Sequence, residues 1–177
     1  VAGAIAFGGG CLARSRYERD CLVTEEYRIV SEKIHGPGKT IVFLTDLHNK
    51  EFGDQNCRLL DAVRKVKPDA VLSGGDGMVA KKGNSDVEIP RKLLTELAKE
   101  FPVYCGNGNH ECRMVWKSDI YGAAYENYQA ALENAGIRYL ANGSADLDGE
   151  IRIYGLDLPK SAYLPRSGQI PENLLKD

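Results

Sequence analysis

The sequence carries almost no net charge, which argues against any overall attraction to a polyanion. Its 177 residues include 23 basic and 25 acidic side chains, leaving a net charge of -2. A protein that holds nucleic acid or an acidic membrane surface by bulk charge is strongly basic, so we expect no nucleic-acid partner. Two local basic clusters, Lys81-Lys82 and residues 64–67, are interpreted as solvated faces.

The cysteines lack the spacing of a metal or redox motif. None of the five forms a Cys-x-x-Cys pair, which argues against a zinc knuckle or a thioredoxin-type site. An odd number in a chain of this length argues against a disulfide framework. Cys105 lies in an apolar run and is interpreted as a small buried residue, and Cys112 is interpreted as incidental to the chemistry.

No apolar run is long enough to cross a membrane. A transmembrane helix needs about 20 consecutive apolar residues, whereas the apolar, glycine-rich start of the chain ends at residue 13, before three arginines. We interpret residues 1–24 as an apolar leader, the remnant of a membrane or signal segment, and residues 25–177 as one domain. This predicts a membrane-associated protein without indicating the side. The alternative is a flexible leader on a cytoplasmic protein, and a lipoprotein cleavage site at Cys11 lacks the expected leucine.

Short apolar runs alternate with amphipathic segments along the rest of the chain. Strands are predicted over residues 27–34, 40–45, 70–73, 103–105 and 137–140. Helices are predicted from Asp54 to before Pro68, from Pro90 through Leu97, and over 119–136. A hairpin through Asp148-Gly149 is predicted to join residues 145–147 to 151–154. A loop is predicted over 158–168, and a short helix from Pro171.

This order of elements predicts the fold class. Strands that alternate with helices indicate right-handed crossovers in a mostly parallel sheet. The strand over 40–45 is nearly all apolar and is expected to be buried on both faces. The hairpin and the half-exposed strand over 27–34 indicate a second, antiparallel sheet. We therefore expect an α/β fold, arranged as a four-layer α-β-β-α sandwich with helices outside two sheets.

Three polar motifs follow three of the predicted strands. They are Asp46-Leu47-His48, Gly75-Asp76 and Gly-Asn-His-Glu at residues 108–111. Open α/β sheets place their sites at the carboxyl ends of strands, so we expect these side chains to meet at one edge. Oxygen ligands mixed with imidazole suit divalent Mn, Fe or Zn. Taken singly, Asp46, Asp76 and Asn109 are typical of turns or a helix cap, and His48 is typical of a hydrogen-bonded loop histidine. The hypothesis therefore depends on the spacing of all three motifs.

The order Asp-x-His, Gly-Asp, Gly-Asn-His-Glu, each after a strand, resembles the calcineurin-like metallophosphoesterase superfamily. Phe52-Gly53 and Lys67-Pro68-Asp69 narrow the resemblance to its bacterial membrane-anchored branch. The resemblance implies the sandwich fold of the metallophosphoesterase type. It also implies hydrolysis of phosphomono- or phosphodiesters by a metal-bridging hydroxide, with a small phosphoester as substrate.

The resemblance also implies a role for each motif residue. Asp46 and His48 would bind the first of two divalent metal ions, and Asp76 would bridge both. Asn109 would bind the second ion through its side-chain oxygen. His110 would be catalytic, bonding the substrate phosphate or protonating the leaving oxygen.

The sequence departs from the superfamily in its histidines. The superfamily completes its site with a further His and a late Gly-His-x-His, whereas the three histidines here are His35, His48 and His110. We therefore expect an incomplete second metal site, a domain lacking its C-terminal strands, and little turnover from a C-terminally truncated fragment. His35 is interpreted as a loop residue. The alternative function is a non-catalytic protein-binding scaffold of the same fold. Trp116 is a candidate for the substrate cleft, and Tyr125 is expected in the core.

Overall fold

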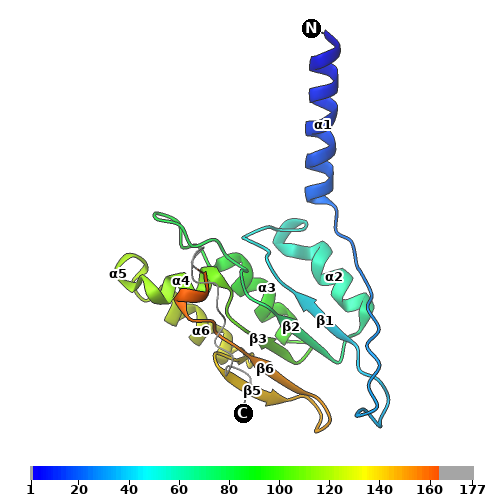
Figure 1. The fold of residues 1–177 in the computed structure, drawn as a ribbon, viewed down its shortest axis with the longest axis vertical. Helices are drawn as coiled ribbons and strands as arrows, with labels where there is room; N and C mark the ends of the chain where they lie inside the picture. The colour runs from blue at the N-terminus through cyan, green and yellow to red at the C-terminus, as the bar shows by residue number, and fades with distance from the viewer. Residues whose placement is uncertain (1, 164–177) are drawn as a thin grey trace.

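Four short strands, all parallel, form the main sheet (Figure 1). The structure is a computed structural model and describes residues 2–163. The strands are β1 (Ile41–Leu44), β2 (Ala70–Ser73), β3 (Val103–Cys105) and β4 (Arg138–Tyr139), and they lie side by side in that order. Their carboxyl ends therefore lie at one edge of the sheet, which is where the three motifs follow.

The connections between these strands are helical. The helices are η1 (Asp54–Asn56) and α2 (Cys57–Val66) before β2, α3 (Glu88–Ala98) before β3, and α4 (Asn109–Trp116), α5 (Ser118–Tyr121) and α6 (Ala124–Asn134) before β4. Each strand is added on the same side of the previous one, so right-handed crossovers place these helices on one face of the sheet. The other face is left for the second sheet.

The core lies between the helices and the main sheet. It is built from buried side chains, among them Leu59, Leu60 and Val63 of α2, Leu93, Leu94 and Leu97 of α3, Leu132 of α6, and Val71, Val103 and Cys105 of the strands. Burying each large apolar side chain contributes about 1.5–3 kcal/mol. The helical spacing of these leucines and valines in α2 and α3 was the basis of the predicted helices there, which are confirmed.

A two-stranded antiparallel sheet packs on the opposite face. Its strands are β5 (Gly143–Asp146) and β6 (Arg152–Gly155), so the predicted hairpin is confirmed. Ala145 and Ile153 of this hairpin pack on Tyr104 and Leu140. The predicted α/β fold, with a parallel sheet and a second antiparallel one, is confirmed. Residues 2–163 contain three of the four expected layers: helices, main sheet and hairpin.

The strand predicted over residues 27–34 is wrong. This segment is coil with a turn at residues 32–33, and its Tyr27, Ile29 and Val30 are 80%, 88% and 82% exposed. An alternating pattern supplies side chains for two faces, but a strand also needs a neighbour for its N–H and C=O groups. Within the described part of the chain, no strand pairs with this segment.

The expectation that β1 is buried on both faces is also wrong. Its Val42 and Leu44 pack toward the helices, whereas Phe43 on the other face is 62% exposed. The hairpin packs on Ala70, Tyr104 and Leu140, which belong to the β2–β4 side of the sheet. The outer face of β1 is therefore left in contact with solvent.

The helix predicted over 119–136 is wrong in its bounds. The chain forms α5, breaks at Gly122 with a φ of 59°, and resumes as α6. A helix, α4, begins at Asn109, where the apolar pattern indicated none. Part of the predicted loop over 158–168 is the 3-10 helix η2 (Lys160–Tyr163). Residues 158–159 are coil, as predicted, whereas residues 164–168 and the helix expected from Pro171 lie outside the described residues.

The N-terminal segment forms helix α1 (Ala2–Asp20), which projects away from the domain (Figure 1). Its C-terminal end is attached by an ion pair between Lys50 and Asp20, and by Arg58 Nη1 donating to the Asp20 carbonyl at 3.4 Å. Leu22 then packs against the core. Among residues 2–163, no helix combines the length and apolarity needed to span a bilayer.

Candidate metal centre

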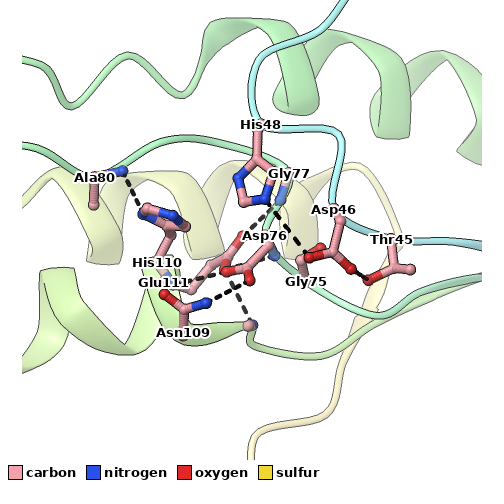
Figure 2. A network of polar contacts seen from close by, with 11 residues as sticks. Thr45, Asp46, His48, Gly75, Asp76, Gly77, Ala80, Asn109, His110 and Glu111 are labelled. Atoms are coloured by element: carbon pink, nitrogen blue, oxygen red, sulfur yellow. Dashed lines mark hydrogen bonds and ion pairs between the residues drawn. The ribbon is translucent and has the colours of Figure 1, made fainter. Parts of the chain in front are cut away.

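The three motifs meet at the carboxyl edge of the main sheet (Figure 2). Asp46 and His48 follow β1, Asp76 follows β2, and Asn109 and His110 begin α4 after β3. Asp46, His48 and Asp76 each offer one ligand atom, and these atoms all lie within 4.8 Å of one another. The predicted convergence of the motifs is confirmed.

The two loops that carry the first three residues have unusual backbone conformations. Asp46, His48 and Asp76 have φ angles of 57°, 49° and 52°, in the left-handed region. This conformation costs a residue with a side chain about 1–2 kcal/mol. Two cross-loop hydrogen bonds offset the cost: Asp46 N donates to Gly75 O at 3.1 Å, and His48 N donates to Asp76 O at 2.9 Å. The left-handed backbone of these three residues is thus held by hydrogen bonds between neighbouring loops.

The glycines of the second and third motifs allow their loops to touch. A Cβ added to Gly75 would lie 2.0 Å from the backbone nitrogen of Gly108. A Cβ added to Gly108 would lie 2.4 Å from the backbone nitrogen of Asp76. Both distances are far below van der Waals contact, so any side chain would separate the loops. This contact explains in steric terms why both motifs contain glycine.

The Asp76 carboxylate is buried and oriented on both oxygens. It is 7% exposed, and its Oδ1 accepts the backbone N–H of His110 at 2.7 Å. Its Oδ2 accepts from Asn109 Nδ2 at 2.8 Å. Because a carboxylate only accepts hydrogen bonds, the amide nitrogen of Asn109 must face Asp76, and its oxygen is the atom suited to a cation. Asp46, by contrast, has a side chain 61% exposed, 3.6 Å from His48 Nε2.

Glu111 joins the second and third motifs, although the sequence analysis assigned it no role. Its side chain is 2% exposed. Its Oε2 accepts hydrogen bonds from the backbone N–H groups of Asp76 at 2.9 Å and Gly108 at 3.0 Å. Its Oε1 accepts one from the backbone N–H of Gly77 at 3.2 Å. Burial raises the pKa of Glu111 to about 7; the N–H donors act against this shift, and the charge of Asp76 adds to it. The available signal was a Glu three residues after Gly108, the residue that precedes the helix, which is the spacing of a capping interaction.

His110 has one ring nitrogen committed to the backbone. Its Nδ1 accepts the N–H of Ala80 at 3.0 Å, so a neutral ring carries its proton on Nε2. Its ring centroid lies 5.1 Å from that of His48, edge to face. Burial lowers the pKa of His110, the charges of Arg113 and His48 add to that effect, and Asp76 opposes it. The site therefore favours a neutral imidazole with its N–H on the side away from Ala80.

A family model described as calcineurin-like phosphoesterase matches residues 39–177, most of the chain and all three motifs. The chain belongs to the calcineurin-like phosphoesterase family. Members of this family are generally hydrolases of phosphoester bonds and depend on divalent metal ions. A search of curated proteins found no match to the chain. The resemblance found in the sequence is therefore confirmed for the family, while the membrane-anchored branch and the truncation stay predictions.

The donor set at this edge of the sheet fits a divalent cation. Two carboxylates and an imidazole are the mixed oxygen and nitrogen ligands that Mn, Fe and Zn accept. Within residues 2–163, no second group of three acidic, histidine or cysteine side chains has its ligand atoms this close to one another. A second ion would have only Asp76 and Asn109 as candidate ligands among the motif residues. Binding of two ions therefore stays a prediction.

The remaining candidates lie outside the cluster. Burial raises the pKa of the Cys105 and Cys112 thiols to about 12, and neither thiol belongs to the group of three clustered ligand atoms. Tyr125 is buried at 8% exposure, as expected. Trp116 packs against Tyr163, with ring centroids 5.5 Å apart, and its place in a substrate cleft stays a prediction. His35 is exposed in a loop, as expected.

Proposed function

We propose that this protein hydrolyses small phosphomono- or phosphodiesters with a metal ion held by Asp46, His48 and Asp76. The observation that carries the proposal is the approach of three ligand atoms to within 4.8 Å from two different loops. When bound, a divalent cation would supply Lewis-acid activation of water and neutralise charge on the phosphoryl oxygens. The motif sequence and the family membership support the same reaction class.

Asp76, Asn109 and His110 have separate roles in the proposed reaction. Asp76 is already oriented by His110 N and Asn109 Nδ2, so it loses little conformational freedom on binding a cation. Asn109 presents its amide oxygen, because its nitrogen is held by Asp76. His110 donates from Nε2 to a phosphoryl or leaving-group oxygen, since its Nδ1 is occupied by Ala80 N–H.

We also propose the finer points of metal and location. Mn, Fe or Zn suits the ligand set, and Asp76 with Asn109 forms a weaker second site. The apolar composition of residues 1–13 and the resemblance to a membrane-anchored branch support association with a membrane surface. Flotation of the chain with phospholipid vesicles, with and without residues 1–24, tests the association. Equal flotation of the two chains would contradict it.

Metal titration tests the site directly. We expect calorimetry with Mn²⁺ to show one tight site in the chelator-treated chain, lost in Asp76→Asn and His48→Ala. Asp119→Asn, on the exposed part of α5, is the matched control and should bind as the parent does. Binding that survives both site substitutions would refute the assigned ligands.

Hydrolysis of p-nitrophenyl phosphate and bis-p-nitrophenyl phosphate then separates enzyme from scaffold. We expect slow, metal-dependent turnover that Asp76→Asn reduces by about 100-fold or more, because charge stabilisation by the ion is lost. Tight metal binding with no turnover of either ester, in the same preparations, would favour the protein-binding scaffold.

A further inference from the structure

The peptide groups on either side of Ala80 are both bonded to α4. The Ala80 N–H donates to His110 Nδ1 at 3.0 Å, and the Ala80 carbonyl accepts from Arg113 Nη1 at 3.1 Å. His110 and Arg113 are three residues apart on one helix, so they present the same face to Ala80. Ala80 itself is 0% exposed, which keeps water from competing for these two bonds.

The two bonds act on different peptide planes. The N–H belongs to the plane before the Ala80 Cα, and the carbonyl belongs to the plane after it. Holding both planes fixes the φ and ψ angles of Ala80, and therefore the direction in which its N–H points. The next residues form a tight turn, in which Lys81 and Asn84 exchange backbone hydrogen bonds of 3.0 and 2.8 Å. His110 therefore holds the peptide plane before the Ala80 Cα, and Arg113 holds the plane after it.

Arg113 is committed to this backbone contact. It is half-buried, and none of the ion pairs found within residues 2–163 includes it. A guanidinium that donates to a carbonyl makes a charge-assisted hydrogen bond, which is stronger than a neutral one. The contact joins α4 to the loop between β2 and α3.

We propose that Arg113 is a positioning residue that fixes the tautomer of His110 by holding the Ala80 peptide. A neutral imidazole has one N–H and one acceptor nitrogen. With Ala80 N–H directed at Nδ1, the proton must be on Nε2. Figure 2 shows the ring between Ala80 and the side chains of His48 and Asp76. Without Arg113 the Ala80 N–H can turn away, and the Nδ1-protonated form, which has no donor at Nε2, becomes populated.

The proposal rests on the proposed function for its consequence, but its test does not need turnover. Long-range ¹H–¹⁵N NMR of the full 177-residue chain reports which ring nitrogen of each histidine carries a proton. With three histidines in the chain, His35→Asn and His48→Asn assign the His110 signals. We expect the Nε2–H form in the parent chain, and a mixture of both tautomers in Arg113→Ala.

Two further variants separate positioning from general destabilisation. Arg113→Lys can still donate to the Ala80 carbonyl and should restore the Nε2–H form. Lys117→Ala, one turn further along and exposed, should leave the spectrum unchanged. If Arg113→Ala does not fold, Arg113→Met, which keeps the aliphatic stem and has no N–H donor, takes its place in the comparison with Arg113→Lys and should show the mixture of tautomers. For bis-p-nitrophenyl phosphate we expect kcat to fall about tenfold in Arg113→Ala, with KM changed less than about twofold.

Each contrary result has a distinct meaning. An unchanged His110 spectrum in Arg113→Ala would overturn the proposal, whatever the rate does. A raised KM with an unchanged tautomer would mean that Arg113 contacts the phosphate directly, which also overturns it. A parent chain with the proton on Nδ1 would contradict the hydrogen bond itself. Absence of turnover in the parent chain would count against the proposed function and leave the NMR test intact.

Discussion

The stability of the metal-free chain should depend on pH through Glu111. This carboxyl is buried beside Asp76, and its pKa is raised from 4.5 to about 7 in the folded chain. A group whose pKa is higher in the folded state stabilises it below the unfolded pKa, and that contribution is lost as pH rises through the folded pKa. Each pKa unit corresponds to about 1.4 kcal/mol, so the loss between pH 4.5 and 8 is about 3 kcal/mol.

Burial and hydrogen bonding shift the pKa of Glu111 in opposite directions. The three backbone N–H groups from Asp76, Gly77 and Gly108 favour the ionised carboxylate, whereas burial and the Asp76 charge favour the neutral acid. Burial is the larger effect, and this determines the sign. Glu111→Gln removes the titration while keeping the shape of the side chain.

Urea unfolding in chelator at pH 5 and pH 8 measures the effect. We expect the parent chain to lose more stability than Glu111→Gln between these pH values, by about 2–3 kcal/mol, since part of the titration lies below pH 5. Other titrating groups cancel in this difference. Glu126→Gln, on the exposed face of α6, should follow the parent chain. A parent chain that gains stability with pH relative to Glu111→Gln would show that the N–H donors prevail, and would refute the reasoning.

Two further predictions concern packing. Gly75→Ala should abolish Mn²⁺ binding and lower the free energy of unfolding by more than about 2 kcal/mol, because its Cβ would lie 2.0 Å from Gly108 N. Gly83 also has a positive φ but lies in open space, so Gly83→Ala should cost only about 1 kcal/mol in thermal unfolding. Equal losses would argue against the loop contact. In thermal unfolding, Phe43→Ala should cost less than about 1 kcal/mol, whereas Leu97→Ala should cost about 2–5 kcal/mol. A large loss for Phe43→Ala would mean that this face is covered.

Local patterns in the sequence were sufficient for much of the fold. The strands β2 and β3, the helices α2 and α3 and the hairpin follow from side-chain period and turn residues, which act over a few positions. The errors come from longer-range effects. Residues 27–34 alternate like a strand but find no partner among the described residues, and Phe43 is exposed because the hairpin does not extend over β1. Strand pairing and burial depend on which segments meet, which no local pattern contains.

The candidate site likewise combines features that the sequence determines with features that only the tertiary structure determines. The sequence by itself determined that Asp46, His48, Asp76 and Asn109 follow strands, and the parallel order of those strands brings them to one edge. Only the tertiary structure decided how they are held. Glu111 bonds the N–H of a residue 35 positions away, and His110 bonds one 30 positions away. Such contacts depend on how closely separate loops approach, and that distance is set by packing across the whole domain rather than by neighbours along the chain.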